Sequence, residues 1–168
     1  MKKIALLFVA AAMLSLTGCG YQLGAPKPHE LANVKKLAVP TFKNDTLEPR
    51  IEVMVTDALI KELQVNGTYK IVPVSEADAV LRGTITGITR RQFRADLNNN
   101  LRSTELSSGL VVRYKIEGPD GAALKSGQAR ESTEVVLDPN FQVTEAQALA
   151  VVAQKLSGSI ASDITQGW

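Results

Sequence analysis

Apolar residues recur at helical spacing shortly after residue 50. The pattern predicts a helix with one core-facing side, formed by Ile51, Met54, Val55, Ala58, Leu59 and Leu63. Asp45 or Thr46 is expected to cap this helix, and Pro49 is tolerated in a first turn. Gly67 is expected to end it. The alternative is that these apolar residues form a lipid-binding stripe, but such a stripe more commonly packs against the core.

A second helical pattern lies near the end of the sequence. Thr144 and Gln147 have the spacing of a capping box. Gly158 weakens the helix slightly. The core-facing positions recur every three or four residues, at Leu149, Val152, Ala153, Leu156, Ile160 and Ile164.

Between and before these helices the pattern changes to short apolar or alternating runs, which indicate strands. Pro40 lacks an N–H and predicts an edge or a bulge in the first run. Asn98, Asn99 and Asn100 favour a long hairpin with a polar tip, and residues 118–121, "GPDG", favour a second turn. The expected strands are residues 36–42, 68–74, 79–94, 110–117 and 122–136.

The order of these elements predicts the architecture. Hairpins require antiparallel neighbours, whereas the first strand reaches its partner across a helix. We therefore expect an α/β two-layer sandwich, with two amphipathic helices packed on one face of a mixed four- to five-stranded sheet.

The first residues have the layout of a bacterial export signal. Lys2 and Lys3 precede an apolar run, residues 4–14, which is too short to cross a bilayer comfortably. Residues 16–19, Leu-Thr-Gly-Cys, resemble a lipobox, in which the cysteine becomes the acylated first residue. The alternative is an ordinary signal peptide followed by an accidental cysteine.

Acylation of Cys19 would anchor the protein to a membrane without a spanning helix, because several acyl chains together bind almost irreversibly. Gly20 stands where Asp would commonly mark inner-membrane retention, so we expect the periplasmic side of the outer membrane. The expected organisation is a signal peptide (1–18), a lipidated N-terminus and tether (19–33) and a single globular periplasmic domain (34–168).

Charge and cysteine content narrow the functional classes. Removal of Lys2 and Lys3 with the signal leaves 17 basic and 17 acidic residues, so the composition does not indicate nucleic-acid binding. Cys19 is the only cysteine, and no disulfide can stabilise the domain. Packing must supply its stability.

The sequence offers no recognisable catalytic set. The only histidine, His29, lies in the expected tether, and no glycine-rich phosphate loop is present. The acidic pairs Glu76 with Asp78 and Glu131 with Glu134 are interpreted as surface charge. We expect no enzymatic activity, no metal and no cofactor.

Several segments together resemble the LptE-type lipopolysaccharide-assembly lipoproteins. They are "GCGYQLG" (18–24), "LAVPTFKNDTLEPRIEVMVTDALIKEL" (37–63), "ADAVLRGTI" (77–85), "LKSGQARESTEVV" (124–136) and the last amphipathic helix. Family members commonly carry an arginine before the glycine of the opening motif, where this chain has Leu23. The resemblance implies a domain that plugs an outer-membrane barrel of the LptD type, helps it assemble and contacts lipopolysaccharide.

Two other classes stay open. "LAVPTFKNDT" followed by a helix also resembles other outer-membrane lipoproteins, including curli-secretion and peptidoglycan-synthase-activator types. Those proteins would bind a different partner. The other open class is a lipid-anchored enzyme, which would need a nucleophile or a metal-binding set that the sequence does not show.

Two sets of residues are candidate contacts. The tip residues Asn98, Asn99 and Asn100 are candidates for the barrel contact, the alternative being a solvated turn. Candidates for binding lipid A phosphates are Arg91, Arg94, Arg102, Arg113 and Lys115. Arg90 and Arg91 must point to opposite faces of a regular strand, so at most one of them shares a face with Arg94 unless a bulge intervenes. The alternative is that these cations only keep the strands from aggregating.

Overall fold

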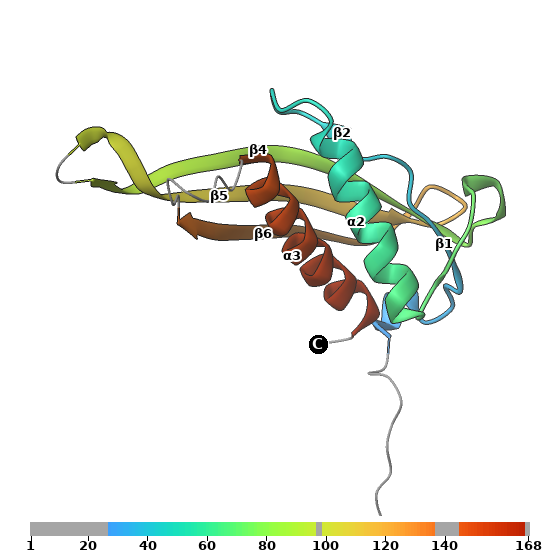
Figure 1. Ribbon diagram of the computed structural model, residues 1–168. Helices are drawn as coiled ribbons and strands as arrows, with labels where there is room; N and C mark the ends of the chain where they lie inside the picture. The colour runs from blue at the N-terminus through green and yellow to red at the C-terminus, as the bar shows by residue number, and fades with distance from the viewer. Residues whose placement is uncertain (1–26, 97–98, 137–144, 167–168) are drawn as a thin grey trace, which may run out of the picture.

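The computed structural model describes residues 27–96, 99–136 and 145–166. Two helices lie on one face of a long sheet (Figure 1). The elements in chain order are η1 (His29–Leu31), β1 (Lys36–Ala38), β2 (Lys43–Asn44), α2 (Ile51–Asn66), β3 (Lys70–Ile71), η2 (Val74–Glu76), β4 (Ala79–Asp96), β5 (Asn99–Glu117), β6 (Ala123–Val136) and α3 (Glu145–Thr165).

The sheet is mixed and has six strands. Its main order is β3-β1-β4-β5-β6, and β2 pairs with β4 outside this path. The pairings among β1, β2, β3 and β4 are parallel, whereas β5 is antiparallel to both β4 and β6. The predicted two-layer α/β architecture is confirmed. The strand count is higher because the run at 36–42 gives β1 alone, and the chain pairs again as β2 after Pro40.

The loop before α2 differs from the prediction. Helix α2 begins at Ile51, and Arg50 before it has a left-handed backbone with φ 66° and no side-chain cap. The expected capping by Asp45 or Thr46 is wrong. The N–H and the hydroxyl of Thr46 both donate to the side-chain oxygen of Asn44, which holds Thr46 in a separate turn. Gly67 ends the helix as predicted, with φ 71° and its N–H bonded to the Leu63 carbonyl.

The predicted strand at 68–74 is mostly wrong. Only Lys70–Ile71 pair, in parallel with β1, and Val74–Glu76 form a 3-10 turn after Pro73. Pro73 has no N–H to donate to a neighbouring strand, which accounts for the early end of β3.

The two predicted hairpins are present, although β5 begins at Asn99 and is longer than the predicted strand 110–117. β4 and β5 pair from Val80 with Glu117 out to Asp96 with Asn99, and β5 continues into β6 through a turn closed by Gly121 at φ 79°. Val112, Tyr114 and Ile116 are buried, whereas Arg113 and Lys115 between them are exposed. The alternation therefore orients one face of β5 toward the helices and one toward solvent.

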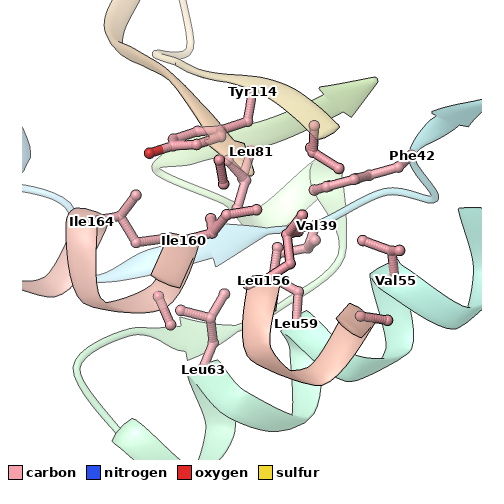
Figure 2. Close-up of a cluster of buried hydrophobic side chains, with 14 of the residues drawn as sticks. Val39, Phe42, Val55, Leu59, Leu63, Leu81, Tyr114, Leu156, Ile160 and Ile164 are labelled. Carbon is pink, nitrogen blue, oxygen red and sulfur yellow. The ribbon is translucent and has the colours of Figure 1, made fainter. Parts of the chain in front are cut away.

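The core lies between the helices and the sheet (Figure 2). α2 contributes Val55, Leu59 and Leu63, and α3 contributes all six of its predicted apolar positions. The Tyr114 hydroxyl also connects the layers, since it donates a 2.5 Å hydrogen bond to the Asp163 carboxylate on α3. Both helical patterns are thus confirmed as core-facing.

The end of the expected tether is folded onto the domain. His29–Leu31 form a 3-10 turn, and Leu31 is buried in the core. The Lys27 ammonium lies 4.6 Å from the centroid of the Tyr69 ring. Tyr69 in turn donates a 2.6 Å hydrogen bond to the Ile164 carbonyl near the end of α3. The N-terminal segment therefore packs where α2 and α3 end (Figure 1).

Candidate ligand-binding face of the sheet

The face of the sheet turned away from α2 and α3 carries polar and charged side chains. The helices take up the opposite face, where the alternation along β4 and β5 places the apolar residues. Arg82 on β4 pairs with Lys115 on β5, and Thr84 pairs with Arg113. These four residues therefore point away from the helices together.

Three cations converge on this face. Neighbouring strands are about 4.8 Å apart and every second residue is about 7 Å along a strand, so Arg82, Lys115 and Arg113 occupy adjacent positions. On β6, Ser126 pairs with Lys115 and Gln128 pairs with Arg113. We name the surface formed by Arg82, Thr84, Arg113, Lys115, Ser126 and Gln128 the cationic face. A hollow of about 400 Å³ lies over it, lined by Arg82, Thr84, Arg113, Tyr114, Lys115, Ser126, Gly127 and Gln128.

One carboxylate partly balances these charges. Glu117 accepts ion pairs from Lys115 at 2.6 Å and from Arg82 at 2.9 Å. Lys115 and Arg82 together lower the pKa of Glu117 below its ordinary value of 4.5. Arg113 is exposed and makes no ion pair with any residue that the structure describes. Its guanidinium is therefore the group best placed to receive an anion.

Two further arginines extend the charge along the same face. The register puts Arg91 opposite Ser107 on β5, and Arg130 on β6 opposite Val111. Both arginines are exposed. Arg90 points to the other side, as strand alternation predicts, and its guanidinium donates to the Glu48 carboxylate at 2.7 Å near the start of α2.

The structure describes only part of the predicted cation set. Arg113 and Lys115 are adjacent, and Arg91 lies farther along their face. Arg94 and Arg102 lie in β4 and β5, but their side chains are outside the described residues, as are those of Asn99 and Asn100. Asn98 lies outside the described residues altogether.

Arg82 is the member of the face that the sequence pattern missed. It lies 31 positions before Arg113 and in no cluster of basic residues. Its partner across the strand, Lys115, is the signal that would have identified it, and that requires the register of the hairpin.

Two of the acidic residues considered from the sequence, Asp78 and Glu131, have structural contacts. Asp78 accepts hydrogen bonds from the backbone N–H groups of Lys36 and Lys35, which lower its pKa. Glu131 accepts a 2.5 Å hydrogen bond from the Ser159 hydroxyl on α3. Over the described ranges, no group of three or more His, Cys, Asp or Glu residues could hold a metal ion.

Chemically, the cationic face can hold phosphate groups. A guanidinium gives bidentate, charge-assisted hydrogen bonds to phosphate, and a lysine adds a mobile point charge. The hydroxyls of Thr84 and Ser126 and the amide of Gln128 add neutral donors around the same hollow. None of the helices in the described part of the chain is both long and apolar enough to span a membrane.

The fold and this face together define a two-layer α/β domain with a charged sheet surface. Residues 34–166 match the LptE family, described as lipopolysaccharide assembly, and the chain belongs to that family. Membership confirms the resemblance seen in the sequence. A search among curated proteins finds no match to this chain.

Solved structures share the fold at low sequence identity. A PelC dodecamer from Paraburkholderia phytofirmans is 16% identical, with a TM-score of 0.54 over 78% of this chain and 89% of that one. The hypothetical protein CT253 from Chlamydia trachomatis is 8% identical, with a TM-score of 0.56 over 78% and 95%. Protein XCC0632 from Xanthomonas campestris is 10% identical, with a TM-score of 0.52 over 86% and 85%. These similarities concern the fold alone.

Proposed function

We propose that this protein is a lipid-anchored outer-membrane component of lipopolysaccharide transport and assembly, which binds a barrel translocon of the LptD type and contacts lipopolysaccharide. The observation that carries the proposal is membership of the LptE family over residues 34–166. The cationic face supports the lipopolysaccharide contact, because lipid A carries phosphates.

The proposed binding mode uses Arg113 as the main phosphate ligand. Lys115 is already paired with Glu117 at 2.6 Å, so it would have to share its charge with a ligand. Arg113 has no carboxylate partner among the described residues, so its charge is not shared. Gln128 and Thr84 lie beside it in the strand register. Because all these groups are close to solvent, phosphate binding here should weaken as salt rises.

The test is lipopolysaccharide binding by the purified protein at two ionic strengths. Arg113→Glu is expected to weaken binding about 10-fold or more, since it replaces a charge-assisted donor with a repelling carboxylate. Lys61→Glu on α2 makes the same charge change on an exposed position of the helical layer, and it should leave binding unchanged. If both variants and the wild type bind lipopolysaccharide with equal affinity at both ionic strengths, the cationic face is excluded as the binding surface.

The proposed anchor rests on Cys19, which lies outside the described residues. Cys19→Ala is expected to abolish acyl labelling in cells and to leave the precursor unprocessed by lipoprotein signal peptidase. Normal labelling and cleavage of this variant would end the lipoprotein proposal.

The proposed barrel partner can be identified by extracting native membranes with detergent and identifying what co-purifies. A lipopolysaccharide-transport barrel would support the proposal, whereas a peptidoglycan synthase or a secretion pore would favour the rival lipoprotein classes. Replacing residues 97–101 with a short glycine-containing turn tests the hairpin tip. Unchanged barrel yield and maturation with a folded domain would exclude the tip as the contact.

A further inference from the structure

A carboxylate at the end of β5 holds two of the three cations of the cationic face. Oε1 of Glu117 lies 2.6 Å from the Lys115 ammonium, and Oε2 lies 2.9 Å from Nε of Arg82 on the neighbouring strand. The Glu117 side chain is 19% exposed, whereas those of Arg82 and Lys115 are 52% and 54% exposed. The carboxylate is thus the sheltered member of the cluster, and both cations are within reach of a ligand.

Glu117 lies beside the hollow over the cationic face. Arg82, Lys115 and Arg113 line that hollow, whereas Glu117 is not part of its lining. Along β5, Lys115 is about 7 Å from Glu117 and Arg113 is about 14 Å from it, because every second residue advances by about 7 Å. Glu117 therefore draws two cations toward the edge of the hollow, and Arg113 keeps its charge available inside it.

The Glu117 carboxylate and a phosphate ligand need the same donors. Both are anions whose oxygens accept charge-assisted hydrogen bonds from guanidinium and ammonium groups. Lys115 and, to a smaller extent, Arg82 lower the pKa of Glu117, so its carboxylate is ionised at neutral pH. A phosphate in the hollow therefore has to displace Glu117 from these cations or remain close to its negative charge.

We infer that Glu117 is an internal competitor for the cations of the cationic face and limits how tightly that face binds phosphate groups. This inference rests on the lipopolysaccharide contact proposed above and adds a residue that determines its affinity. Arg113 receives the ligand first, and Arg82 and Lys115 bind it only as Glu117 releases them. When the ligand leaves, Glu117 pairs with both cations again. Such reversible binding suits a transport component, which must release what it binds.

The opposite role for Glu117 would be to orient Arg82 and Lys115 for the ligand. The two roles predict opposite signs, because removing a competitor tightens ligand binding, whereas removing an orienting partner weakens it. The exposure of both cations favours competition, since ion pairs between exposed side chains do little to fix their positions.

The experiment measures binding of purified lipopolysaccharide, in detergent micelles, to the purified protein at pH 7 and physiological ionic strength. Glu117→Gln should tighten binding about 3- to 10-fold, because it frees two cations from surface ion pairs. Glu134→Gln is the matched control. It removes the same charge from an exposed residue of β6 that pairs with Ser107, about 34 Å along β5 from Glu117, and it should leave binding unchanged.

A second comparison tests whether Glu117 acts through the two cations. In a protein that carries Arg82→Gln and Lys115→Gln, adding Glu117→Gln should change the affinity less than about 2-fold, because the carboxylate no longer has a cation to hold. Urea unfolding of each variant, followed by circular dichroism, checks that the domain is intact.

The outcomes separate this inference from the function beneath it. If the wild type binds lipopolysaccharide and Arg113→Glu weakens that binding, but Glu117→Gln binds equally or more weakly, the competitor role is wrong and the proposed contact stands. Equal tightening by Glu134→Gln, or by Glu117→Gln without the two cations, would reduce the effect to net charge and also overturn the competitor role. If the wild type does not bind lipopolysaccharide, or Arg113→Glu binds as the wild type does, the proposed contact fails and the competitor role with it.

Discussion

Gly83→Ala should strongly destabilise the domain, because the Phe42 ring occupies the space that the new methyl group needs. A Cβ at position 83 would lie 2.2 to 2.5 Å from three atoms of that ring. Gly83 is on the core-facing side of β4, where it pairs with Tyr114 of β5. The β4 backbone is held by this pairing, so the ring must move instead.

The Phe42 ring has little freedom to do so. It is 3% exposed and belongs to the main core cluster (Figure 2). The Phe42 N–H donates to the Thr56 hydroxyl at 3.0 Å, which fixes the backbone of this residue against α2. Overpacking of a rigid core costs about 1–3 kcal/mol. We expect about 3 kcal/mol here, or a fall of roughly 10 °C in the melting temperature.

The assay is urea unfolding of purified variants, followed by circular dichroism. Phe42→Ala alone should cost about 3–5 kcal/mol, because it removes a buried ring. Adding Gly83→Ala to that background should cost less than about 0.5 kcal/mol, because the clash is gone. Gly158→Ala is the control, since a Cβ there meets nothing within 4 Å in α3 and should stabilise by about 0.5–1 kcal/mol. An equal cost of Gly83→Ala with and without Phe42 would refute the steric explanation.

Three further variants test the polar contacts. Ser108→Ala should leave stability unchanged or raise it by about 1 kcal/mol in urea unfolding, because the buried Ser108 hydroxyl has no hydrogen-bond partner among the residues that the structure describes; a clear loss of stability would reveal one. Tyr69→Phe should cost about 1 kcal/mol, because it removes the hydrogen bond to the Ile164 carbonyl. Burial raises the pKa of Tyr69 to about 12, so between pH 10 and 12 this phenol ionises in the unfolded chain but not in the folded one, and the variant should lose less stability over that range. Glu117→Gln should flatten the fall in stability below about pH 4.5, because Lys115 and Arg82 lower the pKa of Glu117 in the folded state; an unchanged acid profile in thermal melts would show that these ion pairs do not contribute.

The sequence predicted the parts of the fold that depend on long periodic patterns. Every apolar position predicted to face the core in α3 is buried, and the alternation in β5 gave the correct inward set. The loop before α2 could not be predicted in the same way. Its shape depends on Asn44, whose amide bonds residues up to eight positions away, and short-range capping rules do not include such contacts.

The candidate site was predictable only where its residues are close in sequence. Arg113 and Lys115 alternate on one strand, and that spacing places them on one face. Arg82 joins them through the register between β4 and β5, which includes a bulge between Ile85 and Gly87. The bulge reverses the direction in which later side chains point relative to simple counting, so the alternation of the sequence does not predict that Arg82 and Arg91 share a face.

The bond between Tyr69 and the end of α3 has a consequence for the order of folding. These residues are 95 positions apart, whereas β4, β5 and β6 follow one another in the sequence and pair in that order. Local pairings close small loops and form first, so the three long strands should assemble before α3 packs on them. Until α3 docks, the chain exposes the part of the apolar side of the sheet that this helix covers. A product truncated before α3 should therefore be aggregation-prone and a target for proteases, even though its three long strands are complete.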